Sequence, residues 1–565
     1  MPYIAKQKIN GKDYYYLRKS VREGKKVISK HIAYLGTDKK QAELKAREII
    51  KNLDKKNISM ENKIVKEKEN NLIQKKISID DLAKFCKEKG FIFRSSDIYG
   101  GYSGFWDFGP LGVELFNNIK KDWWNFFVYQ KENIVGMEAS IISSPKTWRA
   151  SGHIENFNDV FVKCKKCGKT GKLDENEVGK VNCPDCGGEY ISQGKFNLMF
   201  QTKVGTGDGN SETAYLRGET AQGMFMDFKL IFQTSRMQLP FGIAQIGRCF
   251  RNEIAPRDFL FRSREFSIGE FEFFINPEEE KCELLDEKHL NTEFSFLSEE
   301  NQKNNSNKLE KTSIGNLVKK GKLEEWHAYW FAEQIIWFRS LGLDEIKIRE
   351  HMKEELSHYS SATFDIDYEY PFGSKEIAGN ANRGQYDLKQ HEKESKETME
   401  IFDEKYKKKI IPRVIEPTFG IERIFLAILT KAYSDDGRGN IVLNIPPKLS
   451  PIKAGVFPVI KNNEEIVRIS REIYNSLKQE FYVIYDSGGS IGRRYARQDE
   501  IGTPFCITMD EESLKNKDVT IRDRDTTEQV RVKISDLKEI MKRVLNEGHS
   551  ILEFGKRVNT RVKEK

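Results

Sequence analysis

The chain has 565 residues with 38% apolar content, which is enough for sizeable cores and predicts three or four domains. It contains no apolar run of about 18 residues, and its first residues lack the apolar segment of a secretory signal. The sequence therefore predicts a cytoplasmic protein without a membrane partner. The net charge of +8 is compatible with an RNA partner, but solubility explains a bias of this size equally well.

Residues 1–57 predict a small basic unit. The segments DYYYLRKSVR and KKVISKHIAYLG flank a Glu-Gly turn, which is typical of a β-hairpin, here with exposed tyrosines at positions 14–16. A helix is expected from Thr37, followed by a lysine-rich linker over residues 58–77. The hairpin is also weakly similar to the start of some transposase-like chains. Two roles stay open: a grip on tRNA through phosphates and stacking, or a solvated appendage.

Four of the eight cysteines occur as two Cys-x-x-Cys pairs, each followed by glycine. This spacing predicts a structural zinc ribbon over residues 163–192, because four thiolates fill a tetrahedral site and leave no position open for catalysis. Disulfides or redox-active dithiols are the alternative, which the missing secretion signal disfavours. The expected zinc ligands are Cys164, Cys167, Cys183 and Cys186.

Two apolar segments, IAQIGRCF and FSIGEFEFF, are joined by an arginine-rich loop that carries Arg251, Glu253 and Arg262. Far downstream, the segment EPTFGIER supplies Gly420 and Arg423 just before an apolar helix. Because the planar fork of arginine suits phosphate oxygens, these segments predict a site for a polyphosphate. The alternative is a surface ion pair between Arg251 and Glu253.

These segments resemble the second and third signature motifs of class II aminoacyl-tRNA synthetases. The segments SDIYGG, WDFGPLG, LRGETAQ and RQDEIGTP are similar to those of the dimeric glycyl-tRNA synthetases, and the similarity covers residues 78–562. It implies an α/β (α+β) catalytic domain over residues 78–447, with an antiparallel sheet flanked by helices. It also implies that the alternating strands and helices of residues 451–565 form an α/β anticodon-binding domain.

Two segments interrupt the expected catalytic domain. The first is the zinc ribbon, and the second is an asparagine-rich stretch over residues 278–330, which predicts a polar, partly mobile insertion. A buried helix is expected over residues 327–345, with Trp330 and Trp337 in the core.

The resemblance implies that Arg251 contacts the α-phosphate of ATP, that Arg423 reaches the γ-phosphate, and that Phe266 stacks on adenine near Glu253. Arg251, Arg423 and Glu253 are thus the expected catalytic residues, since fixed cations stabilise the charge that develops on phosphate. Mg²⁺ is expected near Glu376 and Glu416. The residues expected at ATP are Arg251, Asn252, Glu253, Phe261, Arg262, Arg264, Phe266, Glu376, Ile377, Gly420 and Arg423.

Glycine has no side chain to grip, so a pocket selects it by excluding larger amino acids and by holding its ammonium group with carboxylates. An ordinary strand-end salt bridge is the alternative for each glutamate. By resemblance, the residues expected at glycine are Glu219, Phe266, Glu270, Glu416, Thr418 and Gly420.

The resemblance implies that a homodimer activates glycine with ATP and transfers it to the 3′ end of tRNA(Gly), with no DNA partner. Arg524 lies between two aspartates, so local pairing is its alternative role. The candidate tRNA contacts are Arg493, Arg494, Arg497 and Arg522.

Three alternatives stay open. One is another class II synthetase for a small amino acid, one is a non-catalytic paralogue that binds RNA or a partner protein, and one is a zinc-ribbon RNA-binding scaffold. The presence of both Arg251 and Arg423 favours an active enzyme.

Overall fold

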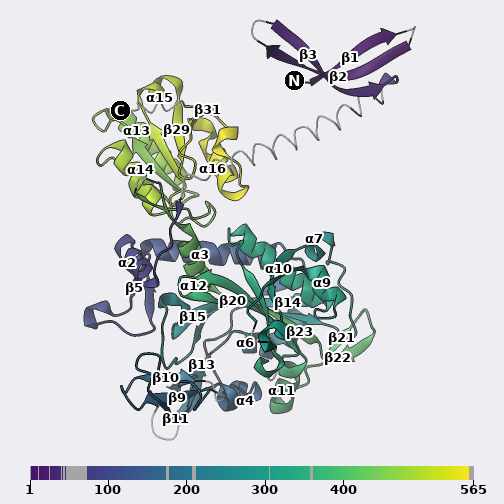
Figure 1. The fold of residues 1–565 in the computed structure, drawn as a ribbon, viewed down its shortest axis with the longest axis vertical. Coiled ribbons are helices and arrows are strands. Elements are labelled where there is room, and N and C mark those ends of the chain that lie inside the picture. Colours follow the sequence, from purple (N-terminus) through teal and green to yellow (C-terminus); the bar gives the residue numbers. More distant parts are fainter. Residues whose placement is uncertain are drawn as a thin grey trace. The chain divides into compact units, whose positions relative to one another are not determined.

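The computed structural model describes residues 2–9, 12–23, 26–39, 41, 45, 73–173, 177–206, 211–304, 306–356, 360–437 and 439–558. The chain forms two compact units, Met1–Ile73 and Gln74–Lys565, whose strands and helices are labelled in Figure 1. Within the described residues, no helix combines the length and apolar character that a membrane crossing needs.

The first unit contains a three-stranded antiparallel sheet in the order β1 (Pro2–Ile9), β2 (Lys12–Glu23), β3 (Lys26–Gly36). Strands β2 and β3 correspond to the predicted hairpin, and β1 is an additional strand. The prediction of exposed tyrosines is wrong for Tyr15, which is buried because alternate residues of a strand point to opposite faces. The helix expected after Thr37 falls almost entirely outside the described residues.

A nine-stranded sheet organises the second unit, and its strands are antiparallel except for the pairs β7–β14 and β16–β18. The expected α/β fold with a largely antiparallel sheet is therefore confirmed. In order across the sheet, the strands are β17 (Glu310–Ser313), β16 (Glu293–Leu297), β18 (Lys347–Glu350), β19 (Ala362–Tyr370), β20 (Gly373–Gly384), β23 (Arg413–Gly420), β15 (Glu265–Ile275), β14 (Phe241–Phe250) and β7 (Ile134–Gly136).

Helices α3 (Pro110–Trp124), α10 (Glu325–Ser340) and α12 (Ile421–Ala432) contribute to the main apolar core. Trp123 and Trp330 are fully buried in it, and Trp330 packs against Phe271 of β15 with ring centroids 4.8 Å apart. Helix α6 (Ala221–Ser235) belongs to a second core, which includes Phe274 of β15. Because Phe271 and Phe274 lie on opposite faces of one strand, the two cores cover opposite faces of the sheet.

The shorter elements connect this sheet to the rest of the catalytic unit. The helices among them are α2 (Ile79–Lys89), α4 (Pro145–Ala150), α5 (His153–Asn156), α7 (Glu287–Leu290), α8 (Glu299–Lys303), α9 (Ile314–Lys319) and α11 (Tyr386–Ser395). Three strands, β9 (Asn158–Cys164), β10 (Thr170–Leu173) and β11 (Tyr190–Asn197), form a separate sheet that carries the cysteine pairs.

The segment over residues 278–330 differs from the expected loose insertion. Its strands β16 and β17 extend the edge of the nine-stranded sheet, and Phe294, Phe296 and Leu317 are buried in the main core. The alternation of apolar and polar residues in EFSFL supports a half-buried strand, whereas the asparagine-rich composition of the neighbouring residues obscures it.

The C-terminal elements, light green to yellow in Figure 1, form a six-stranded sheet. The alternation of strands and helices predicted from residue 451 onward is confirmed. The strands, in order across the sheet, are β27 (Val483–Tyr485), β26 (Ala454–Pro458), β28 (Phe505–Met509), β29 (Asp518–Asp523), β30 (Gln529–Lys533) and β31 (Lys556–Arg557), and the helices are α13 (Glu464–Leu477), α14 (Ile491–Glu500), α15 (Glu511–Asn516) and α16 (Leu537–Asn546).

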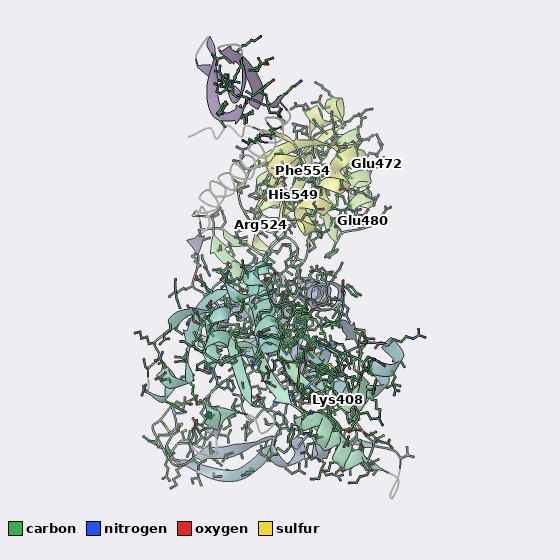
Figure 2. The ribbon with its side chains drawn as sticks, turned by 90° about the vertical axis from the view of Figure 1, so that its right-hand side faces the viewer. Lys408, Glu472, Glu480, Arg524, His549 and Phe554 are labelled. Carbon is green, nitrogen blue, oxygen red and sulfur yellow. The ribbon has the colours of Figure 1, made fainter. Side chains whose placement is uncertain are left out.

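Arg524, labelled in Figure 2, joins this C-terminal sheet to the segment that precedes it. Its guanidinium donates to the carbonyl oxygens of Gly502 and Ile445 and to Oδ1 of Asn444, and it pairs with Asp525 at 2.6 Å. Since the side chain is 2% exposed, the local-pairing alternative for Arg524 is the one that the contacts support.

Replacing Arg524 with methionine removes these donors, so the Gly502 carbonyl oxygen and the Asp525 carboxylate lose their Arg524 partner. We expect the free energy of unfolding of the transition that includes the C-terminal sheet to fall by about 3 kcal/mol, measured by calorimetry on the full chain. Arg493→Met is the matched control, because that side chain is exposed, and it should change stability by less than about 0.5 kcal/mol. An Arg524→Met chain as stable as the control would contradict this account of the contacts.

Candidate active site

A pocket of about 130 Å³ opens where strands β15, β20 and β23 meet the arginine-rich loop. We call it the arginine pocket. Its lining combines basic, acidic and aromatic side chains with a glycine at the start of helix α12. The residues that line it are Arg251, Glu253, Leu260, Phe261, Arg262, Ser263, Phe266, Ser267, Ile268, Glu376, Thr418, Gly420, Glu422 and Arg423.

Arg251 is held in this pocket by its surroundings. Its guanidinium lies 5.2 Å from the ring centroid of Phe157 and 5.3 Å from that of Phe266, and its Nε donates to the carbonyl oxygen of Gly218 at 3.1 Å. Contact with two aromatic rings and one fixed acceptor orients the guanidinium before any ligand binds.

Arg423 projects into the same pocket from the first turn of helix α12. Its Nη1 donates to the carbonyl oxygen of Glu376 at 3.0 Å and lies 3.1 Å from the Glu376 carboxylate, and its guanidinium lies 4.5 Å from the ring centroid of Phe261. Two arginines that are far apart in the sequence therefore line one pocket. Such a pair of cations suits an anion that carries several phosphates.

An ion pair between two of its own residues stabilises the arginine-rich loop that lines the pocket. Arg262 donates from Nε to the carboxylate of Glu253 at 2.7 Å, and Arg264 donates to the carbonyl oxygen of Glu253. The partner of Glu253 is thus Arg262, so the alternative of an Arg251–Glu253 surface pair is not what the contacts support.

Three residues expected at ATP lie outside the lining of the arginine pocket. The Asn252 backbone N–H donates to Leu198, Arg264 braces the loop and reaches the Ser103 carbonyl oxygen, and the Ile377 side chain is buried in the main core. The Ile377 side chain could not contact a ligand, because alternation along β20 turns it into the core.

A second group of acidic side chains lies on the face of the sheet that helix α6 covers. We call it the carboxylate cluster, and it comprises Glu219, Glu270, Glu272, Asp387 and Glu416. Glu270 pairs across the sheet with Thr418, which also lines the arginine pocket. The three glutamates expected at glycine are therefore close to the arginine pocket.

Basic side chains and a hydroxyl donor contact four of the five acidic residues of this cluster. Arg383 donates from Nη1 to Glu416 and from Nε to Asp387, both at 2.8 Å, and His153 Nε2 lies 3.2 Å from the Glu219 carboxylate. The Thr220 hydroxyl donates to Glu270 at 2.6 Å. Burial alone would raise the pKa of Glu219, but His153 and Arg383 lower it below its ordinary value.

For Glu270 and Glu272, burial and neighbouring negative charges outweigh the groups that lower a carboxyl pKa. Burial, together with the charges of Glu416 and Glu219, raises the pKa of Glu270 to about 8. Burial also raises the pKa of Glu272 well above its ordinary value, again with Glu416 adding to the rise. Glu272 is fully buried, and neither of its carboxylate oxygens has a hydrogen-bond partner among the described residues. The cluster therefore has more acidic groups than positive partners, which suits a small cation such as an ammonium group.

The sequence predictions missed Glu272, Arg383, Asp387 and His153. A signal existed for Glu272, because residues two apart on a strand share a face and Glu270 was already expected at the site. No local pattern marks Arg383 or His153, whose partners come from distant segments. Glu422 was also missed, although it precedes Arg423, lines the arginine pocket and accepts from the Ser267 N–H at 2.7 Å.

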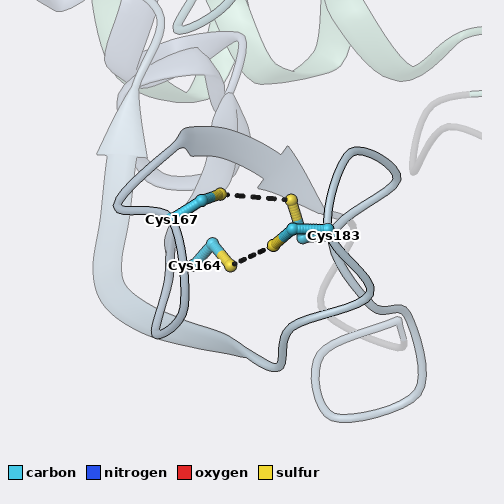
Figure 3. Close-up of side chains that lie close together, drawn as sticks. Cys164, Cys167 and Cys183 are labelled. Atoms are coloured by element: carbon cyan, nitrogen blue, oxygen red, sulfur yellow. Dashed lines mark hydrogen bonds between the residues drawn. The ribbon is translucent and has the colours of Figure 1, made fainter.

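The four cysteines of the ribbon converge, and Figure 3 shows three of them labelled. Their sulfur atoms all lie within 4.8 Å of one another, with Cys164–Cys186 at 3.5 Å and Cys167–Cys183 at 3.7 Å. These separations are too long for disulfides. They fit a tetrahedron of thiolates about 2.3 Å from a central Zn²⁺. A Cβ on Gly188 would lie 2.8 Å from the Cys164 sulfur, so the turn leaves room for the thiolates and nothing larger.

The four candidate tRNA contacts divide into two pairs. Arg494 is buried and donates to the carbonyl oxygens of Pro458 and Asp486, and Arg522 is buried in a bidentate pair with Asp499 at 2.8 and 2.9 Å. Neither side chain is available to RNA, so the prediction is wrong for these two. Arg493 and Arg497 are exposed on helix α14 and stay predictions.

Comparison with known proteins agrees with this geometry. The anticodon-binding domain family matches residues 453–544. The glycine–tRNA ligases of Borreliella burgdorferi and Treponema denticola are each 40% identical to the chain over 82% of its length, covering 97% and 96% of their own lengths. The corresponding protein of Geobacillus thermodenitrificans is 41% identical over 82% of the chain and 97% of its own length. The chain therefore belongs to the glycine–tRNA ligase family, the glycyl-tRNA synthetases of class II.

Proposed function

We propose that the protein is an active glycine–tRNA ligase, which activates glycine with ATP and transfers it to the 3′ end of tRNA(Gly). The observation that carries this proposal is the placement of the arginine pocket beside the carboxylate cluster, through the pairing of Glu270 with Thr418. The arginine pocket suits polyphosphate and the carboxylate cluster suits an ammonium group, so together they match the two substrates of the first step. The C-terminal anticodon-binding domain supplies the region that meets tRNA.

In the first step, a carboxylate oxygen of glycine attacks the α-phosphorus of ATP. The bond from that phosphorus to the oxygen bridging to the β-phosphate breaks, and pyrophosphate leaves with the electron pair. Arg251 stabilises the charge near the α-phosphate, while Arg423 and Arg262 bind the departing phosphates. The orientation of Arg251 between two rings supports this role, because a fixed cation needs no reorganisation during the reaction.

The remaining ATP contacts follow from the lining of the pocket. Phe266 and Phe261 offer faces to adenine, and Glu253 accepts from its exocyclic amine. Mg²⁺, when bound with ATP, neutralises phosphate charge, and Glu376 is the side chain on the pocket wall that would hold it. Glu416 is less suited to the metal than expected, because Arg383 engages it in the carboxylate cluster.

Glycine is selected by charge and by size. Glu219, Glu270 and Glu416 bind the ammonium group, and Thr418 and Phe266 occupy the space that a larger side chain would need. A rigid wall discriminates through a clash, which can exceed the roughly 1–3 kcal/mol lost with a missing methylene.

Zinc in the ribbon and a homodimer complete the proposal. The tetrahedral arrangement of the four sulfurs supports a structural Zn²⁺.

The dimer is supported by an apolar groove of about 640 Å³ beside edge strand β7, where Trp124, Met137 and Ile246 line the surface and Tyr129 is 76% exposed. An exposed apolar groove of this kind at a sheet edge suits a second copy of the chain.

Amino-acid-dependent exchange of pyrophosphate into ATP tests the function. We expect exchange with glycine and none with alanine, serine, threonine or proline. Arg251→Ala should lower the glycine-dependent rate by about a hundredfold or more, since it removes a cation from the reacting phosphate. Arg257→Ala is the matched control, because this arginine of the same loop lies outside the arginine pocket and is 66% exposed. Absence of exchange with every amino acid in the wild type would favour a non-catalytic RNA-binding paralogue.

The raised pKa of Glu270 predicts how glycine binding depends on pH. With a pKa of about 8, Glu270 is mostly protonated at neutral pH in the empty site, whereas an ammonium ligand favours its ionised form. Binding therefore releases a proton, and affinity for glycine should rise with pH, with the KM falling by up to about tenfold per unit below pH 8.

The measurement is a pH profile of the KM for glycine, with the KM for ATP as internal control. Glu270→Gln should raise the KM for glycine and flatten its pH dependence, because glutamine holds no titrating proton. A KM for glycine that is constant from about pH 6 to 8 in the wild type would contradict the role given to Glu270.

Metal analysis tests the ribbon. We expect about one zinc per chain and near-complete loss of zinc in Cys183→Ser, because three thiolates cannot close the tetrahedral site. Cys282→Ser is the control, since that buried cysteine lies away from the ribbon and its loss should leave the zinc content unchanged. Zinc retained by Cys183→Ser, or absent from the wild type grown with zinc, would overturn the assignment.

A further inference from the structure

The N-terminal unit concentrates the positive charge of the chain. Residues 1–36 contain nine lysines and arginines but only two acidic residues, a net charge of +7 within a chain whose total is +8. The other 529 residues are therefore almost neutral as a whole. A small sheet with this charge density needs an explanation that the glycine and ATP sites do not provide, since it forms a compact unit of its own.

One face of the sheet is aromatic. Tyr14 and Tyr16 of strand β2 share a face, and Tyr34 of β3 lies across from them with ring centroids 6.3 and 5.3 Å away. The Arg18 guanidinium lies 5.8 Å from the ring centroid of Tyr16. Three tyrosines and an arginine thus meet on one surface, and Tyr34 is 52% exposed.

The opposite face of the sheet carries the small apolar core that stabilises the unit. Tyr15, Leu17 and Leu35 are buried there, with exposures of 8%, 0% and 1%. The aromatic residues of the first face are therefore not needed to form this small core, although a tyrosine cluster that served only packing would be expected to be buried with it. Lys12 of β2 is exposed and shares the face of Tyr14 and Tyr16, since residues two apart on a strand point the same way.

This unit precedes residues 78–562, over which the sequence resembles the family. Glycine–tRNA ligases from several bacteria are matched over 96–97% of their own lengths, yet they cover only 82% of this chain. The enzyme that they represent is thus complete without about a hundred of the residues present here.

We propose that the aromatic face of the N-terminal sheet is a tRNA-binding surface. An unpaired base stacks on Tyr34 and its neighbours, while Arg18 and Lys12 contact the adjoining phosphates. Basic side chains around exposed aromatic rings form the combination that holds single-stranded nucleic acid. The choice of tRNA as the occupant rests on the proposed function, which requires the protein to bind this RNA.

The test uses the full chain and separates RNA binding from amino-acid activation. Tyr34→Ala should weaken tRNA binding about tenfold and raise the KM for tRNA in aminoacylation, because it removes a stacking surface. Tyr34→Phe should bind like the wild type, because the ring is retained. Phe402→Ala is the matched control, since this aromatic residue of the catalytic unit is 46% exposed and should not affect tRNA binding.

Charge is tested in parallel. Lys12→Ala combined with Arg18→Ala should weaken binding and reduce the slope of log affinity against log salt by about one to two, because phosphate contacts release counterions. All of these variants should retain wild-type glycine-dependent pyrophosphate exchange, which needs no tRNA. A failure of the proposed function would appear in that assay, and a failure of this surface would appear only in tRNA binding.

Two results would overturn the inference. The first is wild-type tRNA affinity in both Tyr34→Ala and the Lys12/Arg18 double variant. The second is a wild-type protein that binds duplex DNA through these residues as tightly as it binds tRNA at the same salt concentration, which would assign the sheet to DNA.

Discussion

Buried negative charge between strands β15 and β23 is the constraint on which the site depends. The carboxylate cluster places five acidic side chains in a low-dielectric region, where Arg383 pairs with Glu416 and Asp387 and the His153 ring contacts Glu219. Burying unpaired carboxylates is costly, so some of them keep a proton until a cation arrives. In the proposed function glycine brings such a cation, and its binding energy comes from completing an interaction that the fold leaves unfinished.

This arrangement requires a stiff scaffold. If β15 and β23 moved apart, the carboxylates would reach water and lose their selectivity for a small ammonium group. The fully buried Trp123 prevents this, because its ring packs against Phe271 of β15 and Phe419 of β23, with centroids 6.3 and 5.6 Å away. The apolar core on one face of the sheet thus fixes the spacing of the acidic groups on the other.

The same strands also connect the two substrates. Strand β23 contributes Glu416 and Thr418, then ends at Gly420, where helix α12 begins and Arg423 enters the arginine pocket. A run of eight residues therefore spans from the proposed ammonium site to the proposed phosphate site. The geometry requires no protein nucleophile, since glycine's own carboxylate attacks and the protein supplies fixed charge.

The sequence predicted the features that local patterns encode. Arg251, Arg423 and the four cysteines stand in motifs whose spacing reflects their chemistry, and the strand–helix alternation after residue 451 follows from apolar periodicity. Arg383 and His153 were not predictable, because their partners lie on distant segments. Arg494 and Arg522 look like RNA contacts by residue type. Their side chains instead point into the domain and pair with internal acceptors, and the sequence does not show the direction of a side chain.

Calorimetric binding of a non-reactive analogue of glycyl-adenylate, in which a sulfamate replaces the phosphate, tests the central claim most directly. The analogue is expected to contact the arginine pocket and the carboxylate cluster at once. Its alanyl counterpart differs by one methyl group. The account predicts tight binding of the glycyl analogue and binding of the alanyl analogue that is at least about a hundredfold weaker. Equal affinity for the two would contradict a site built to hold an ammonium group against a wall that excludes a side chain.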